Sequence, residues 1–340
     1  MDDQDSYCVL CGEPGIIIFQ NQPDRVHGYP GDWDIMGCRE CGLYWVWPVP
    51  THDALVSYYA TYHTHGKSSA AKPSAFQHLM TTFVVQRRAF HWHLMRWLFF
   101  SGKRPLHPHV FRRIGQYLSA HLWVPSSNVS KGTLLDVGAG NGWYLRLMAD
   151  LGWHVIGIEP DGEAALHARE VAKVPVITSE LQSSLFEPQS FDAITLRHVI
   201  EHLPEPDAVL STCFKLLKPG GCLVIICPNS SSLGSRHFQE YWRGWEVPRH
   251  VFMYNPENLS QLVSAIENFV VETVQTENFN AWWFYLSSVP RPHNLWSWIA
   301  ALGGAFAFAI QESLLMKHDR WIGEEIVLIA RKPNAQTTAS

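Results

Sequence analysis

The chain has 340 residues, of which 46% are hydrophobic and 17% are charged, and its formal net charge is −5. This composition excludes a chain that is disordered throughout, because it supplies enough apolar side chains for a sizeable core. The negative net charge also argues against a protein that coats nucleic acid along its whole length.

Residues 1–50 have the cysteine pattern of a zinc ribbon. Two Cys-x-x-Cys pairs, each followed directly by a glycine, are separated by 26 residues, and short strands are expected at 16–19 and 32–38. Four thiolates can bind one zinc ion tetrahedrally, which leaves no open position for catalysis. We therefore predict a structural Zn²⁺ ion with four ligands: Cys8, Cys11, Cys38 and Cys41.

The cysteine usage and the first residues also bear on location. Cysteine pairs that bind metal suit a reducing compartment, and the acidic start, MDDQDS, lacks the apolar run of a signal peptide. We expect a cytoplasmic protein, which could also be peripheral at a membrane.

Residues 51–130 are expected to form a helical connecting region rich in basic and aromatic side chains. Between Ala54 and Leu135 there are ten Lys or Arg residues and no Asp or Glu, so the rest of the chain has a net charge of −15. Helical spacing is evident over 76–100 and again over 109–122. A segment of one charge sign indicates an anionic partner: a phosphate group, an anionic lipid surface or RNA.

Strand and helix patterns alternate between residues 131 and 335, which predicts a Rossmann-like, doubly wound α/β domain. Helices are expected at 142–151, 162–170 and 206–217 and from about residue 256. Strands are expected at 133–138, 154–159, 174–178, 191–197, 220–228, 269–276 and 326–333. The apolar segment 277–325 is an insertion between the last two strands.

The first strand leads into DVGAGNG, in which three glycines alternate. A dinucleotide site needs a small residue at the sixth position from Gly138, and Trp143 stands there. The compact turn instead suits a ligand with an amino-acid tail, such as S-adenosylmethionine, whose ammonium Asp136 would bind. Glu159 ends the second strand, where a carboxylate can accept hydrogen bonds from ribose hydroxyls.

Successive motifs resemble those of class I S-adenosylmethionine-dependent methyltransferases: DVGAGNG, GIEPD, SFDAITLRHVIEHLPEP and LLKPGGCLVIICPN. The resemblance covers about 130–280 and the closing strand. It is strongest to the subgroup with an N-terminal zinc ribbon, which includes sugar C-methyltransferases. It implies a seven-stranded sheet whose last strand is antiparallel.

The resemblance also implies cofactor contacts at the ends of the first four strands. Residues after the first strand would contact the methionine part, those after the second the ribose, those after the third the adenine, and those after the fourth the sulfonium. Together with Asp136, the expected contacts are Gly138, Ala139, Gly140, Glu159, Pro160, Glu180, Leu181, Arg197 and His198.

Transfer to a hydroxyl, or to a carbon beside a carbonyl, needs a base. Glu201 and His202 follow the fourth strand, and they either face the substrate or brace the next helix. His250 matches the histidine that serves as base in the resembling family, or it is bonded to the backbone. We take these three residues as catalytic candidates, with His250 as the base.

The loop 236–259 is rich in aromatic and charged residues and lies where α/β sheets bind ligands. Trp242, Trp245 and Arg249 are therefore the substrate-binding candidates. Arg249 stands where the sugar enzymes have a glutamate, which suggests an anionic acceptor. No Asn-Pro-Pro-aromatic motif follows the fifth strand, which disfavours methylation of adenine N6.

Residues 295–310 form an apolar run of 16 residues, and the segment from Pro292 to Gln311 has no charged residue. Three interpretations are open: a buried helical hairpin, an element at a membrane surface together with the basic run 83–113, or a membrane-spanning helix.

The sequence thus predicts a methyltransferase for a small or glycan-type acceptor that could be lipid- or nucleotide-linked. An RNA methyltransferase that uses the basic stretch 54–135 is the second hypothesis, with nucleic acid the less favoured partner. A non-catalytic zinc-ribbon scaffold is the third. The acceptor atom and the oligomeric state stay open.

Overall fold

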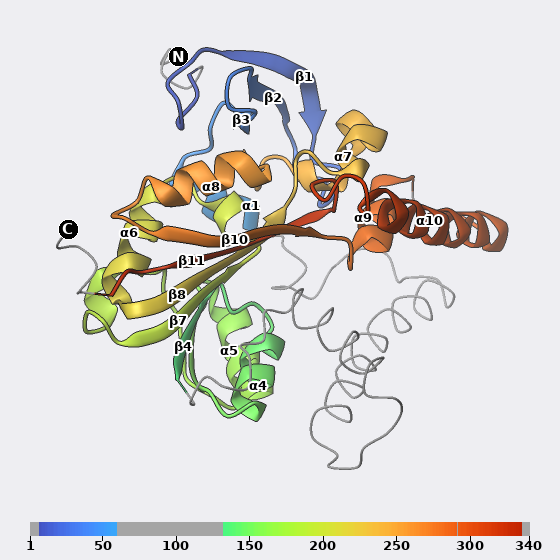
Figure 1. Cartoon of the computed structure of the whole chain (residues 1–340). Coiled ribbons are helices and arrows are strands. Elements are labelled where there is room, and N and C mark those ends of the chain that lie inside the picture. The colour runs from blue at the N-terminus through green and yellow to red at the C-terminus, as the bar shows by residue number, and fades with distance from the viewer. Residues whose placement is uncertain (1–6, 60–131, 291, 335–340) are drawn as a thin grey trace. The chain divides into compact units, whose positions relative to one another are not determined.

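The computed structural model describes residues 7–59, 132–290 and 292–334 (Figure 1). The chain divides into two compact units, one of residues 1–66 and 123–340 and the other of residues 67–122. The second unit lies outside the described residues. The predictions for 76–100, 83–113 and 109–122 therefore stay untested.

The larger sheet has seven strands in the order β10-β11-β8-β7-β4-β5-β6 (Figure 1). Five strands are parallel: β4 (Thr133–Val137), β5 (His154–Ile158), β6 (Val176–Ile177), β7 (Phe191–Arg197) and β8 (Leu217–Pro228). The last strand, β11 (Glu325–Arg331), runs antiparallel to both β8 and β10 (Val270–Glu277). The predicted Rossmann-like sheet with an antiparallel last strand is confirmed.

Helices cover both faces of this sheet, as Figure 1 shows. The helices α4 (Trp143–Asp150) and α5 (Gly162–Ala172) pack their buried side chains into one core cluster with β4 and β5. On the other face, α6 (Pro206–Leu216) and α8 (Pro256–Ser264) belong to a second cluster. Short helices lie in the connections: η2 (Ser183–Leu185), η3 (Ile200–His202), α7 (Leu233–Phe238), η4 (Gln239–Tyr241) and η5 (Arg243–Trp245).

Side-chain caps fix where two of these helices begin. The Asp161 carboxylate accepts a hydrogen bond from the Ala164 N–H at 2.7 Å at the start of α5. At the start of α8, Asn255 and Asn258 each bond to the backbone of the other, which is a capping box. Polar side chains that accept from the first free N–H groups stabilise a helix start by about 1 kcal/mol.

The N-terminal ribbon forms a separate sheet, but a later segment completes it. Its strands are antiparallel and lie in the order β1 (Gly15–Pro23), β2 (Asp32–Cys38), β3 (Tyr44–Trp47) and β9 (Phe252–Met253). The helix α1 (His52–Tyr59) follows β3. Buried residues of the ribbon, Cys8, Cys38 and Trp45 among them, share one hydrophobic cluster with residues of the larger sheet. The ribbon is therefore packed into the same body as that sheet.

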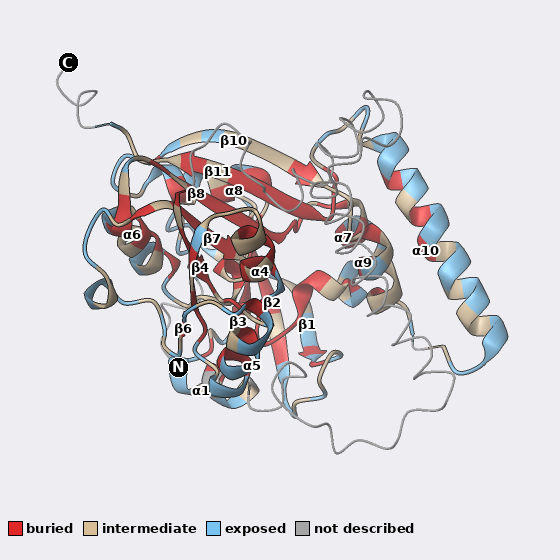
Figure 2. Ribbon diagram, turned by 90° about the horizontal axis from the view of Figure 1, so that it is seen from below, coloured by how far each residue is buried: buried red, intermediate tan, exposed pale blue. Residues whose placement is uncertain are grey.

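The insertion between β10 and β11 consists of α9 (Ala281–Ser288) and α10 (Leu295–Leu315). The helix α10 has 21 residues, more than the 16 of the predicted apolar run, and only 17% of its most apolar window is buried. It buries three residues, Ala305, Phe308 and Glu312, and Figure 2 shows exposed residues along its length. The interpretation as a buried helical hairpin is therefore wrong, because most of this helix faces solvent. By length and composition it could cross a membrane.

Candidate functional site

The turn after β4 has three glycines in the left-handed region, with φ of 74° at Gly138, 52° at Gly140 and 75° at Gly142. A Cβ at Gly138 would lie 2.5 Å from the Val199 side chain, and one at Gly142 would lie 2.7 Å from the Ala168 carbonyl oxygen. A Cβ at Gly140 would meet no atom of another described residue within 4 Å, chain neighbours apart. Two glycines thus permit close packing, while Gly140 leaves open space beside the backbone, as a ligand cradle requires.

Glu159, which directly follows β5, lies against this turn. One carboxylate oxygen accepts a hydrogen bond from the Gly140 N–H at 2.8 Å, and the other accepts one from the Asp161 N–H at 3.1 Å. Glu159 is buried, and Pro160 beside it is exposed. A carboxylate can accept about four hydrogen bonds, and ligand hydroxyls are suitable donors to it. The adjacent Ala139 is buried, with its N–H donated to Ile158.

Asp136 and Arg197 lie on neighbouring strands below the turn. The buried Asp136 carboxylate accepts a hydrogen bond from the Thr195 hydroxyl at 2.6 Å. Burial raises the pKa of Asp136 to about 7, although Thr195 and the positive charge of Arg197 act in the opposite direction. The Arg197 guanidinium lies over the Tyr144 ring, 4.4 Å from its centroid. Both predicted cofactor residues are thus held by contacts within the protein.

The two residues predicted near the adenine lie after β6. Glu180 is exposed, and its carboxylate lies 2.6 Å from Nε2 of His52 on α1. The hydrogen bond and the negative charge of Glu180 raise the pKa of His52. Leu181 is half-buried and packs against the main hydrophobic cluster. Glu180 is therefore paired with α1, the helix that follows β3.

His198 follows β7 and has a left-handed backbone with φ of 55°. Its ring contacts two buried carboxylates, with Nδ1 at 3.4 Å from Glu201 and Nε2 at 3.0 Å from Glu325. Desolvation disfavours the charged ring, but the hydrogen bonds to Glu201 and Glu325 outweigh it and raise the pKa of His198 to about 10. The side chain is 42% exposed, so solvent weakens this effect, yet the direction favours an imidazolium at the carboxyl edge of the sheet.

The three catalytic candidates converge. Glu201, His202 and His250 each place one ligand atom within 4.8 Å of the others. The histidine pair, His202 and His250, has its rings edge to face with centroids 4.7 Å apart. Nδ1 of His202 donates to the Arg249 carbonyl at 3.0 Å, and Nδ1 of His250 donates to the Gly244 carbonyl at 2.7 Å. Each neutral ring therefore carries its lone pair on Nε2.

The surroundings of the histidine pair favour a neutral His250 ring beside an ionised Glu201 carboxylate. Burial lowers the pKa of His250 to about 4, and the charge of Glu246, 3.4 Å from Nε2, only partly offsets it. Burial alone would raise the pKa of Glu201, but the His198 contact and the nearby histidines lower it. The Glu201 oxygens accept no hydrogen bond of ordinary length from the described residues. At pH 7 the His250 ring is therefore neutral, with its unprotonated Nε2 near Glu246, while the Glu201 carboxylate is ionised.

The three substrate candidates are placed differently from the expectation, because their polar atoms are engaged inside the protein. Nε1 of Trp242 donates to Glu324 at 3.0 Å, and Nε1 of Trp245 donates to the Gln239 carbonyl at 2.7 Å. Arg249 is fully buried and forms a bidentate ion pair with Asp24 of the ribbon. The reason for expecting an anionic acceptor therefore falls away.

Residues 106–273 match a family described as a methyltransferase domain, and the match includes the glycine turn, Glu159 and the catalytic candidates. The seven-stranded sheet with its antiparallel last strand is the architecture that the sequence resemblance implied. The chain contains a class I S-adenosylmethionine-dependent methyltransferase domain. Residues 106–131 of the match lie outside the described residues.

Several curated relatives of the methyltransferase domain are named ubiquinone biosynthesis O-methyltransferase. The protein from Colwellia psychrerythraea is 33% identical over 141 residues, which cover 38% of this chain and 56% of the relative. The protein from Xanthomonas campestris pv. campestris is 36% identical over 138 residues, which cover 38% of this chain and 55% of the relative. The chain thus spans about half the length of these relatives.

Solved structures with similarity to the chain include a possible histamine N-methyltransferase from Thermotoga maritima. It is 19% identical, with a TM-score of 0.42 and coverage of 66% of this chain and 99% of that one. A phosphoethanolamine N-methyltransferase from Haemonchus contortus is 20% identical, with a TM-score of 0.43 and coverage of 70% and 56%. Scores this low do not by themselves establish a common fold.

The four predicted zinc ligands cluster beside the methyltransferase domain. The sulfur atoms of Cys8 and Cys41 are 3.5 Å apart, those of Cys11 and Cys38 are 3.4 Å apart, and those of Cys11 and Cys41 are 3.8 Å apart. Tetrahedral zinc with Zn–S bonds of about 2.3 Å requires sulfur atoms about 3.8 Å apart. The four side chains therefore fit one zinc ion.

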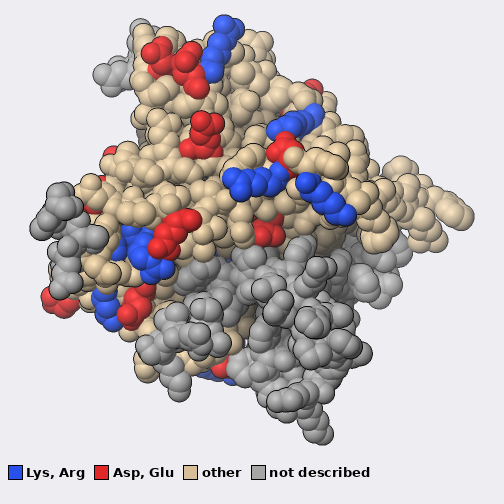
Figure 3. Space-filling model, in the orientation of Figure 1, with Lys and Arg blue, Asp and Glu red and all other residues tan. Residues whose placement is uncertain are grey.

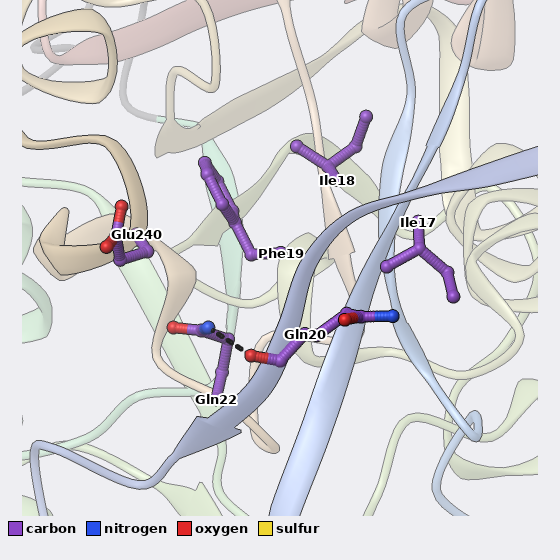
Figure 4. A pocket seen from close by; sticks show the side chains of 6 residues that line it. All are labelled: Ile17, Ile18, Phe19, Gln20, Gln22 and Glu240. Atoms are coloured by element: carbon purple, nitrogen blue, oxygen red, sulfur yellow. Dashed lines mark hydrogen bonds between the residues drawn. The ribbon is translucent and has the colours of Figure 1, made fainter.

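A depression of about 470 Å³ lies along β1, and its lining includes none of the predicted site residues (Figure 4). Its lining comes from β1 and η4, and it comprises Ile17, Ile18, Phe19, Gln20, Gln22 and Glu240.

Three buried acids were not singled out by the sequence analysis: Glu246, Asp24 and Glu325. Only Glu325 stands beside an apolar run, and nothing in the neighbouring sequence distinguishes Asp24 or Glu246 from surface acids.

Proposed function

We propose that this chain is an S-adenosylmethionine-dependent O-methyltransferase that acts on a hydroxyl group of a small, lipid-soluble acceptor. The observation that carries the proposal is the contact of Glu159 with Gly140, which places a carboxylate against an open glycine turn. The names of the relatives support oxygen as the acceptor atom. We assign the activity to residues 131–335, with the ribbon at 1–50 and the helical region at 51–130.

S-adenosylmethionine supplies a methyl group on a sulfonium, which makes that methyl electrophilic. In the proposal, the backbone at Gly138 and Gly140 lines the methionine part, and Glu159 binds the ribose hydroxyls. The open space at Gly140 and the position of the Glu159 carboxylate beside it support this fit. The predicted contact of Glu180 with the adenine has less support, because the Glu180 carboxylate is paired with His52.

The histidine pair takes the proton of the acceptor hydroxyl, with His250 as the base. Its Nε2 carries the lone pair, and its lowered pKa keeps the ring neutral at pH 7. Glu201, which is buried and ionised, would stabilise the positive charge that the pair acquires. The charged ring of His198 repels that charge, so Glu201 and Glu246 have to hold it.

We further propose that α10 inserts into one leaflet of a membrane and brings the site to a lipid-soluble acceptor. The half from Leu295 to Gly304 has no charged residue, and Trp296 is 77% exposed. Ten helical residues span about 15 Å, half the thickness of a bilayer core. Figure 3 shows no Lys, Arg, Asp or Glu on the visible face of this projecting helix.

The other half of α10 is anchored on the body of the protein, which supports insertion from one side and not a full span. Phe308 packs against Tyr285 of α9, with ring centroids 5.5 Å apart. Where the two halves meet, a Cβ at Gly304 would lie 2.3 Å from the Tyr285 hydroxyl, so α9 and α10 touch there. We propose a peripheral protein on the cytoplasmic side, where thiolates that bind zinc stay reduced.

The proposed activity can be tested in two steps with the purified full chain. Calorimetry with S-adenosylmethionine and its demethylated product should give one site per chain. Incubation with S-adenosylmethionine and a hydroxylated, prenylated aromatic should then give the methyl ether by mass spectrometry, with the His250→Asn variant as control. Absence of cofactor binding would leave the chain as a zinc-ribbon scaffold. Methylation of RNA in place of the aromatic would support the basic stretch as an RNA-binding track.

A further inference from the structure

We propose that the N-terminal ribbon positions the histidine pair of the methyltransferase domain, through Asp24 and β3. The proposal rests on the proposed function, because it assigns a role toward the residues that accept the proton. Asp24 and Arg249 are positioning residues in it, since neither has to touch the substrate or the cofactor.

The first connection is a buried ion pair between the ribbon and the loop of His250. Nη1 of Arg249 donates to Asp24 at 2.9 Å, and Nη2 donates to the other Asp24 oxygen at 2.7 Å. Both side chains have 0% exposure. Burial raises the pKa of Asp24, but the Arg249 hydrogen bonds outweigh it and lower the pKa. A paired, desolvated contact of this geometry fixes the position of the guanidinium.

Backbone N–H groups of the ribbon fix the position of Asp24 itself. The Asp24 carboxylate also accepts hydrogen bonds from the backbone N–H groups of Val26, His27 and Tyr29, each at 3.0 Å. The turn after β1 is therefore wrapped around this one carboxylate. Any displacement of the turn moves the acceptor of Arg249.

The second connection runs through the backbone between β3 and η3. The Val46 N–H of β3 donates to the Val251 carbonyl at 3.0 Å, and the Val251 N–H donates to the Glu201 carbonyl at 2.7 Å. Residue 251 is thus bonded on one side to the ribbon and on the other to the turn that carries Glu201 and His202. The pairing of β3 with β9 extends the same contact.

These connections end on the histidine rings. The carbonyl of Arg249 accepts the Nδ1 proton of His202 at 3.0 Å, so a shift of Arg249 breaks this hydrogen bond. Glu246 contacts Arg243, Arg249 and His250, and therefore couples the same ion pair to the second ring. The orientation and the tautomer of His202 thus depend on Arg249, which the ribbon fixes, and His250 is coupled to Arg249 through Glu246.

The glycine turn has no direct part in this network. Gly138, Gly140 and Glu159 lie at the ends of β4 and β5. Their hydrogen bonds join Gly140 to Glu159, Gly138 to Ile158, and Glu159 to Asp161 and Ile177. Weakening the ribbon should therefore reduce the methyl-transfer rate and leave cofactor affinity unchanged. A general loss of folding would reduce both together.

The test compares three variants of the full chain: Asp24→Asn, Arg249→Lys and, as a control on the same ribbon, Asp32→Asn. Asp32 is an exposed residue of β2. The measurements are kcat, its dependence on pH, the Kd of S-adenosylmethionine, and ¹⁵N NMR of the histidine side chains. Circular dichroism checks the fold of each variant.

We expect kcat to fall at least tenfold in Asp24→Asn and Arg249→Lys, with the cofactor Kd within about twofold of wild type. The pH at which the rate rises should shift, and the Nδ1–H signal of His202 should lose its protection. Asp32→Asn should match wild type throughout. If one variant does not fold, the other decides.

Unchanged kcat, pH profile and NMR signals in a folded variant would overturn the positioning proposal. A rise in the cofactor Kd in parallel with the loss of kcat would also overturn it, because the ribbon would then act only through overall stability. Failure of the proposed function gives a different result, since the wild-type chain itself would neither bind the cofactor nor transfer a methyl group.

Discussion

One oxygen of the Glu159 carboxylate accepts a hydrogen bond from the Gly140 backbone N–H at 2.8 Å. This contact joins the carboxyl ends of β4 and β5, which are neighbouring parallel strands. The acid and the glycine turn are thus arranged for a ligand by the protein's own hydrogen bonds, so little reorganisation is needed when a ligand binds.

Replacing Glu159 should weaken cofactor binding strongly. Glu159→Ala removes an acceptor for the ribose and the bond that fixes Gly140, and we expect a loss of about 2 kcal/mol, or roughly 30-fold in Kd. Calorimetry with the demethylated cofactor measures it. The control is Glu180→Gln, since Glu180 is exposed and paired with His52, and its Kd should change less than about threefold. Equal effects of the two substitutions would contradict the assignment of Glu159.

The cysteine cluster should hold one zinc ion per chain. Cys11 is exposed, so Cys11→Ser removes a ligand without opening a cavity in the core. We expect zinc in this variant, measured by atomic absorption after dialysis, to fall well below the single equivalent of wild type. Cys222→Ser, which changes a cysteine outside the cluster, should retain full occupancy. Full zinc content in Cys11→Ser would exclude a four-cysteine site.

Membrane binding should depend on the exposed apolar residues of α10. Trp296 and Ile299, both in the half of α10 proposed to insert, are 77% and 51% exposed, so replacing both with serine should cost little folding stability, less than about 1 kcal/mol. We expect recovery with liposomes in a flotation assay to fall several-fold, because the inserted apolar surface is lost. The control, Val270→Ser, changes an exposed apolar residue on β10. Unchanged flotation of the double variant would argue against insertion of α10.

Glu312 should make folding stability fall as the pH rises. Burial, with the charges of Glu324 and Glu325, raises the pKa of Glu312 from 4.5 to about 9. Between these pH values the folded protein binds a proton that the unfolded chain has lost. The stability from this group is therefore complete below about pH 4.5 and declines up to about pH 9. The slope is at most about 1.4 kcal/mol per pH unit.

The Glu312→Gln variant tests this dependence, because the amide stays neutral at every pH. Denaturant unfolding of wild type and variant should differ little near pH 5, and the variant should be the more stable protein at pH 8. Parallel stability curves over that range would show that Glu312 ionises normally in the folded chain. Glu277, whose pKa burial raises from 4.5 to about 7, adds a similar slope to both proteins over a narrower pH range.

The sequence was informative where local pattern and packing agree. The run FDAITLR predicted β7 with its observed bounds, since five of its seven residues are buried in a parallel sheet. The glycine turn was predictable because positive φ leaves few residue types to choose from. The cysteine cluster followed from spacing alone, as metal ligands must converge on one point.

Contacts between distant segments could not be predicted in this way. Arg249 was expected to face a substrate, because nothing near it in the sequence indicates that Asp24, 225 residues away, is its partner. The same holds for His198, whose two carboxylate partners come from η3 and β11. For α10 the apolar composition could not distinguish a buried helix from an exposed one, since both require the same residues.

The pairing of Tyr44 with Met253 has a consequence for biosynthesis. Because the chain is synthesised from its N-terminus, β1, β2 and β3 leave the ribosome long before β9, the fourth strand of their sheet, has been made. The edge of β3 stays uncovered until residue 253 has been synthesised, and closing so long a loop is slow. During that interval the uncovered edge of β3 can pair with a wrong strand. Early binding of metal by the ribbon cysteines would reduce that risk.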